Sequence, residues 1–100
     1  AVERTLKLLG ANLRTARLRR NLTIQDMAAK IGTGVRAIAD AEKGKLATGI
    51  GTYAALLWAV DLLTQLDDVA DPAKDKEGMA LSLIKGRERA HPAGGIDNDF

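Results

Sequence analysis

The sequence predicts an all-α protein, and two observations lead to that fold class. The chain has 100 residues, of which 46% are hydrophobic and only 3% aromatic, and its abundance of alanine and leucine favours helix over sheet. Apolar residues also recur every three or four positions along several stretches, as they do on one face of a helix. We expect one domain over residues 1–70, followed over residues 71–100 by a hinge and a tail that can add one short strand at residues 79–84.

The first helix is predicted from Thr5 to Arg20. Its apolar face consists of Leu6, Leu9, Leu13 and Ala16. Gly10 lies within this helix and costs about 1 kcal/mol relative to alanine. The helix therefore either starts late or packs closely against a neighbouring element at Gly10.

Two short helices joined by a tight turn are predicted at about residues 24–31 and 34–42. Ala28 is small where the two helices cross, Gly32 suits a turn that needs positive φ, and Ile38 fills the angle between the helices. This pattern is typical of the helix-turn-helix that reads DNA, and a plain helical hairpin is the alternative.

Residues that cap helices flank both segments. Thr23 and Asp26 can form a capping box at the start of the first helix, and Thr33 can cap the second. Gly44 follows the second helix and can end it. These signals place the two helix boundaries independently of the apolar pattern.

Charge is unevenly distributed along the chain. Residues 1–45 hold ten Lys and Arg against four Asp and Glu, a net charge of +6, whereas residues 46–100 hold five against nine, a net charge of −4. A basic front half favours an anionic partner at one end of the molecule. The alternative is two solvated surfaces that differ in sign by chance.

Two further helices are predicted, a strongly apolar one from Thr52 to Leu63 and a short one from Gln65 to Ala70. Trp58 points off the apolar stripe, so it either marks an interface or folds back onto the domain. In residues 79–84, Met79, Leu81 and Leu83 alternate with smaller residues, which favours a strand, although so short a run can equally be helical.

The residue types give little support to catalysis. Ser82 is the only serine, His91 is the only histidine, and the chain has no cysteine. We therefore expect no enzymatic activity, no metal and no cofactor. The absence of cysteine fits a reducing cytoplasm, where we expect the protein to lie. No apolar run approaches the ~20 residues of a membrane span, so we expect no membrane contact.

Several segments combine into one signature: Leu9-Gly-Ala-Asn-Leu-Arg-Thr-Ala-Arg17, Leu22-Thr-Ile-Gln-Asp-Met-Ala28, Gly32, Ile38 and Glu42-Lys-Gly44. Over about residues 9–62 this signature resembles the Xre/phage-repressor helix-turn-helix family. The resemblance implies a compact five-helix, lambda-repressor-like domain that dimerises on palindromic double-stranded DNA. It also implies a structural ion pair between Arg17 and Glu42.

A second, shorter signature consists of Leu57-Trp-Ala-Val60, Leu66 and Asp71-Pro-Ala-Lys-Asp-Lys-Glu-Gly78. It resembles the HipB-type antitoxins, which are encoded beside HipA-type kinase toxins. This resemblance implies a repressor that autoregulates its operon and acts as the antitoxin of a HipA-like serine/threonine kinase. The alternatives are a plain Xre-type repressor without a toxin, and a protein-interaction module that keeps the fold but does not bind DNA.

DNA contacts are expected along the second helix of the motif. Arg36 can take a guanine and Val35 can touch a thymine methyl group. Backbone and phosphate contacts are expected from Gln25, Lys30, Thr33, Gly34, Lys43 and Lys45. Two residues depart from the family pattern: Ile24 stands where glutamine is common, and Asp40 stands where a cation is common.

A homodimer is expected because so small a domain offers only one recognition helix. We expect the dimer interface and the surface for a protein partner to be formed by apolar residues of the last helices and the tail. These are Trp58, Leu62, Leu63, Leu66, Met79, Leu81, Leu83 and Phe100.

Overall fold

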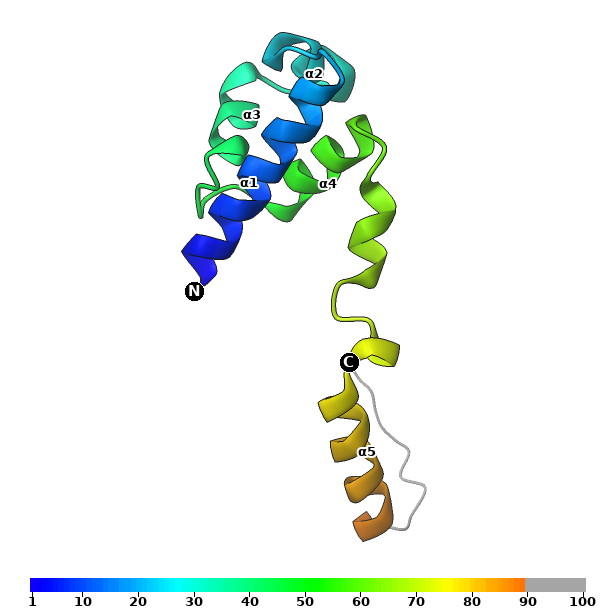
Figure 1. The fold of residues 1–100 in the computed structure, drawn as a ribbon. Helices are drawn as coiled ribbons and strands as arrows, with labels where there is room; N and C mark the ends of the chain where they lie inside the picture. Colours follow the sequence, from blue (N-terminus) through cyan, green and yellow to red (C-terminus); the bar gives the residue numbers. More distant parts are fainter. Residues whose placement is uncertain (90–100) are drawn as a thin grey trace. The chain divides into compact units, whose positions relative to one another are not determined.

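The computed structural model describes residues 1–89, and within them every regular element is a helix (Figure 1). The all-α prediction is therefore confirmed. The α-helices are α1 (Val2–Arg19), α2 (Ile24–Ile31), α3 (Val35–Glu42), α4 (Ile50–Ala59) and α5 (Lys76–Arg89). Two 3-10 helices, η1 (Leu63–Asp68) and η2 (Pro72–Lys74), lie between α4 and α5.

Contacts between residues divide the chain into two units, Ala1–Asp67 and Asp68–Phe100. The first unit holds α1 to α4 and most of η1, which occupy the places of the five helices predicted from the sequence.

The core of the first unit is formed by apolar side chains from all four α-helices. Ile38, Ala41 and Val60 are 0% exposed, and Leu56 is 1% exposed. The remaining buried members are Leu13, Ala16, Met27, Ala28, Tyr53, Leu57 and Ala59. These positions recur at helical spacing in the sequence, and burying them stabilises each helix through tertiary packing more than through its own propensity.

Close packing explains why α1 tolerates a glycine in its interior. Gly10 is buried, and a Cβ atom at this position would lie 2.5 Å from the backbone oxygens of both Ala41 and Glu42. Gly44 approaches α1 in the same way, since a Cβ atom there would lie 2.5 Å from the Lys7 Cα atom. α1 begins at Val2 and continues through Gly10, so close packing and not a late start is the correct alternative.

The local signals of the helix-turn-helix are largely confirmed. The Thr23 side chain accepts a hydrogen bond from the Asp26 backbone N–H, and the Asp26 carboxylate accepts one from the Thr23 N–H, which completes the capping box. Gly32 ends α2 with φ of 74°. The prediction for Thr33 as a cap is wrong, because Gly34 holds the N-cap position of α3 and no side chain caps this helix.

In the second unit the strand proposed for residues 79–84 is wrong, because these residues lie within α5. The alternating run is only six residues long, and Met, Ala and Leu are all good helix formers. The Asp75 carboxylate accepts a hydrogen bond from the Gly78 N–H and so caps the start of the helix. His91 and Phe100 lie outside the described residues.

Candidate nucleic-acid interface

α3 exposes one face of its short length. Ile38 and Ala41 turn into the core, so the opposite face carries Arg36, Asp40 and Lys43 at intervals of three and four residues. The Arg36 side chain is 87% exposed, and Val35 beside it is 46% exposed. The start of α3 thus offers a guanidinium and an apolar side chain to an external partner.

A shallow groove joins this face to the start of α2. Its lining includes Thr23 and Gln25 at the N-terminus of α2 and Val35 and Arg36 at the N-terminus of α3. Leu18, from the last turn of α1, completes one side. The structure therefore brings together the residues predicted to read bases and Gln25, which was predicted to contact the DNA backbone.

The negative charge of Asp40 is balanced by neighbouring cations. The Lys45 Nζ atom lies 3.2 Å from Asp40 Oδ1, and the Arg36 Nε atom lies 4.0 Å from the same oxygen. Asp40 is only 29% exposed in its side chain, whereas Arg36 is 87% exposed. The departure from the family pattern at Asp40 therefore leaves the exposed face of α3 with a surplus of positive charge, to which Lys43 also contributes.

Arg17 and Glu42 form a buried ion pair behind this face. The Arg17 Nε atom lies 2.6 Å from Glu42 Oε2, and Nη2 lies 2.9 Å from Oε1, with side chains 8% and 7% exposed. The third guanidinium nitrogen donates to the Leu22 carbonyl at 2.9 Å. Hydrogen bonding to Glu42 raises the pKa of Arg17 above its usual value. All three contacts fix α1 against the motif, so Arg17 holds the site in place and is not available to a phosphate.

Lys30 faces a different neighbour from the other predicted DNA contacts. Its Nζ atom donates a hydrogen bond of 2.9 Å to the Ala59 carbonyl at the end of α4, and it lies 5.7 Å from the centre of the Trp58 ring. A cation in this position satisfies a carbonyl and the negative end of the α4 dipole. Lys30 thus connects α2 to α4.

In the first unit, the residues expected at a protein interface differ in their exposure. Trp58 is 52% exposed and Leu63 is 38% exposed, whereas Leu62 and Leu66 pack partly against the core. In α5, Met79, Leu81 and Leu83 are exposed. Phe100, the last member of the set, lies outside the described residues.

Sequence reasoning missed Leu18, Asn21 and Ala39, which also line the groove. Leu18 is 47% exposed, and a leucine that lies off the apolar stripe of an amphipathic helix was the available signal. Asn21 adopts φ of 55°, the left-handed conformation that ends α1 beside the groove.

The fold and this exposed face are those of a helix-turn-helix domain. A family model described as Helix-turn-helix matches residues 13–57, from the middle of α1 to the second half of α4. This match supports a helix-turn-helix domain over these residues, of the kind found in DNA-binding transcription regulators. No curated protein and no solved structure matches the chain. Among the described residues, no helix is long and apolar enough to cross a membrane.

Proposed function

We propose that this protein is a sequence-specific repressor that inserts the N-terminal half of α3 into the major groove of double-stranded DNA. One observation carries the proposal: Arg36, with its side chain 87% exposed, shares a groove with Val35 and with Gln25 at the start of α2. A helix-turn-helix docks through these parts, the N-terminal residues of its second helix contacting base edges.

Each member of this face has a specific role in the proposal. Arg36 donates two hydrogen bonds to the O6 and N7 atoms of a guanine, and Val35 contacts the methyl group of a neighbouring thymine. Gln25, Lys43 and Lys45 contact the phosphate backbone, together with the N–H groups of Thr33 and Gly34. α3 supports the last role because no side chain of its own caps its first N–H groups. Lys30 is left out of the proposed contacts because it binds the end of α4.

The active form in the proposal is a two-fold dimer on a palindromic operator. One copy presents a single α3 of eight residues, which reaches only a few base pairs. Two copies about 34 Å apart read two half-sites on the same side of the duplex. The exposed Trp58 and Leu63 support a seam formed by α4 and η1, because their apolar side chains are not buried by their own unit.

The finer proposal is that this repressor is also the antitoxin of a HipA-like serine/threonine kinase and represses its own operon. It rests on the resemblance of residues 57–78 to HipB-type antitoxins. The exposed Met79, Leu81, Leu83 and Ile84 of α5 support a protein partner, since they are 44% to 69% exposed. A module that binds protein without DNA is less well supported, because the charge of Asp40 is paired with Lys45.

DNA binding is tested by fluorescence anisotropy on duplexes that the full chain selects from a random-sequence pool. Affinity should fall linearly with salt on a double-logarithmic plot, with a slope of about −0.9 for each phosphate neutralised. A flat salt response, or the absence of any selected sequence, would contradict the proposal.

The kinase partnership is tested by co-purification with the kinase encoded beside the gene. Leu81→Asp combined with Leu83→Asp should abolish capture, because it places charges at two exposed apolar positions of α5. Ser82→Asp is the matched control, since Ser82 is also exposed on α5 and is already polar. Capture by all three proteins alike would remove α5 from the proposed interface, and capture by none would leave a repressor without this partner.

A further inference from the structure

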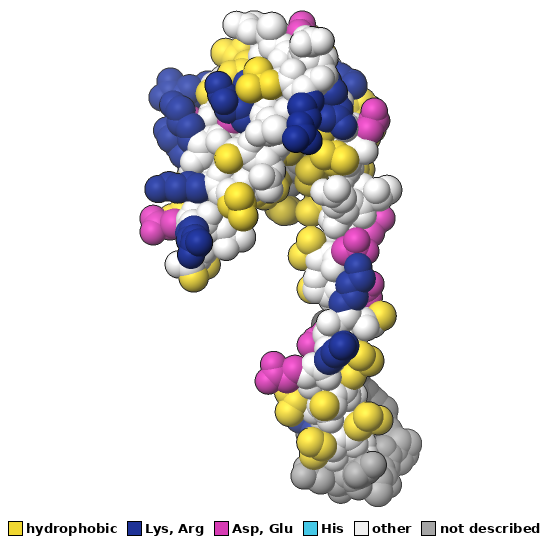
Figure 2. All heavy atoms as spheres, viewed as in Figure 1, with side chains coloured by type: hydrophobic (Ala, Val, Ile, Leu, Met, Phe, Trp, Pro, Cys, Tyr) yellow, Lys and Arg dark blue, Asp and Glu magenta, His cyan; other side chains and the backbone are white. Residues whose placement is uncertain are grey.

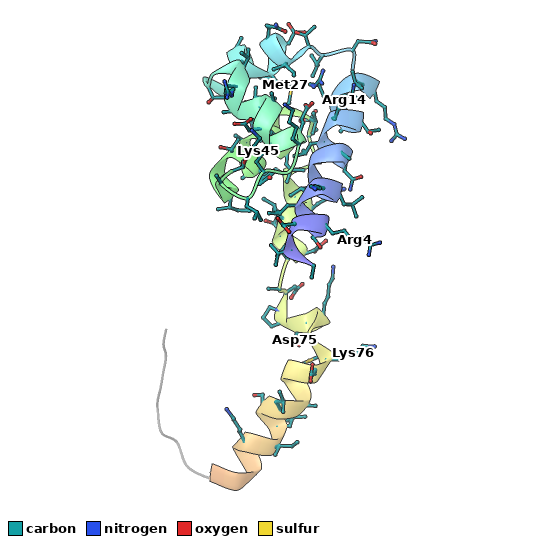
Figure 3. All side chains as sticks on the ribbon, turned by 90° about the vertical axis from the view of Figure 1, so that its left-hand side faces the viewer. Arg4, Arg14, Met27, Lys45, Asp75 and Lys76 are labelled. Carbon is teal, nitrogen blue, oxygen red and sulfur yellow. The ribbon has the colours of Figure 1, made fainter. Side chains whose placement is uncertain are left out.

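Three cations of α1 lie on one edge of that helix, outside the helix-turn-helix motif. Arg4, Lys7 and Arg14 are all exposed. At 100° per residue, the three positions fall within about 80° of each other around the helix axis. Arg4 and Arg14 are seen along the same edge of α1 in Figure 3. We refer to Arg4, Lys7 and Arg14 as the α1 basic edge.

The α1 basic edge borders α3 and the loop that follows it. Arg17, one turn beyond Arg14, binds Glu42 at the end of α3, and Gly44 packs against the backbone of Lys7. Leu18 lines the groove together with Val35. The first half of α1 therefore lies beside the end of α3 and the loop that follows it, and the long Arg17 side chain reaches the same end of α3, whereas Leu18 lies beside the groove at the start of α3.

The charges of the α1 basic edge are not neutralised by their surroundings. None of the ion pairs within residues 1–89 involves Arg4, Lys7 or Arg14. Glu3 is the only acidic residue of α1. Figure 2 shows Lys and Arg side chains gathered over α1 and α3. A partner with regularly spaced negative charge would fit this edge.

We propose that the α1 basic edge binds the phosphate backbone that flanks the groove entered by α3. The inference rests on the proposed function and extends its DNA surface to a helix outside the motif. Ten residues separate Arg4 from Arg14, which is about 15 Å along the helix axis. Over about 15 Å of the duplex axis, one DNA strand carries about four phosphates. Lysine and arginine side chains are long and flexible enough to follow these phosphates without reading any base.

The test compares the salt dependence of DNA binding for two double variants of the full chain. Lys7→Ala with Arg14→Ala removes two members of the α1 basic edge, of which Lys7 lies against Gly44 in the loop that follows α3. Arg19→Ala with Arg20→Ala is the control, since it removes the same charge from the end of α1 and its C-cap, at positions that line a separate hollow with Leu62 and Gln65. Thermal melting by circular dichroism establishes that both double variants fold.

The variant of the basic edge should show a slope less steep than wild type by about 1.8, which is about 0.9 for each phosphate that the variant no longer neutralises. Its ratio of specific to non-specific affinity should not change, because phosphate contacts carry no sequence information. The control should keep the slope of the wild type. Equal slopes for all three proteins would overturn the inference, as would an equal reduction in both variants, since that reduction would follow net charge and not position.

These outcomes are distinguishable from a failure of the proposed function. If wild type shows salt-dependent binding and the Lys7/Arg14 variant keeps its slope, α3 still binds DNA and only the proposed role of α1 is wrong. If wild type itself binds no duplex, both the proposed function and this inference are wrong.

Discussion

The Arg17 guanidinium binds the Glu42 carboxylate through two hydrogen bonds, of 2.6 and 2.9 Å, with both side chains more than nine-tenths buried. The pair joins the last turn of α1 to the last residue of α3. Because α3 is only eight residues long, its orientation depends on contacts of this kind more than on its own helix propensity.

Glu42→Gln should lower the free energy of unfolding by about 3 kcal/mol, because it leaves the buried Arg17 charge without a counter-charge. Urea unfolding monitored by circular dichroism measures this decrease. The double variant Arg17→Met with Glu42→Leu should recover most of it, because no buried charge remains. A single variant as stable as wild type would show that the pair contributes little to the position of α3.

Gly10→Ala should destabilise the protein by about 1–3 kcal/mol although alanine is the better helix former, because the new Cβ atom would meet the carbonyls of Ala41 and Glu42 at 2.5 Å. Gly51→Ala is the control, since Gly51 lies in the first turn of α4 and a Cβ atom there would meet nothing within 4 Å. Thermal melts should show opposite shifts for the two variants, Gly51→Ala gaining up to about 1 kcal/mol. Equal gains would refute the close packing of α1 on α3.

Much of the motif could be predicted because its signals are local. The capping box of Thr23 and Asp26 and the positive φ of Gly32 each depend on residues within one helical turn. The contact of Lys30 was harder to predict, because its partner Ala59 is 29 residues away and no short sequence pattern joins the two residues. The consequence of Asp40 also depended on Lys45, which lies beyond the end of α3.

In the second unit the local sequence pattern was ambiguous. Six residues with alternating apolar side chains cannot distinguish a strand from a helix, and α5 is set by helix formers and by the Asp75 cap. The close approach at Gly10 was left open for a related reason. A glycine within a helix signals either a weak helix or a tight approach of another element, and only the neighbouring α3 decides between them.

Lys30→Met should alter the fluorescence of Trp58, which is the only tryptophan, because it removes a cation 5.7 Å from the ring centre. Stability should fall by about 0.5–1.5 kcal/mol because the hydrogen bond to the Ala59 carbonyl is removed. The salt dependence of DNA binding should not change. If the slope of affinity against salt became less steep by about 0.9 and the fluorescence did not change, Lys30 would instead be a phosphate contact.

Asp26 should make stability depend on pH in the acid range. Hydrogen bonding from the Thr23 backbone N–H, followed by its side chain, lowers the pKa of Asp26 below its usual value. A carboxylate with a lowered folded pKa stabilises the fold above its unfolded pKa, and this contribution is lost as pH falls through the folded pKa. Wild type should therefore be more stable than Asp26→Asn at pH 7. In chemical unfolding series this difference should shrink below about pH 4. A difference that stays constant down to the folded pKa and below would contradict the role given to the charge.

The central claim is that α3 reads bases through Arg36, and its most direct test is the ratio of affinities for a selected duplex and a scrambled one. Arg36→Ala should lower this ratio by a factor that corresponds to about 1–3 kcal/mol of binding free energy. It should also relax the preference at one base pair in each half-site. Lys43→Ala, a neighbouring cation on the same face, should weaken binding to both duplexes alike. A ratio that Arg36→Ala leaves unchanged, with both duplexes still bound, would contradict the claim that this side chain reads sequence.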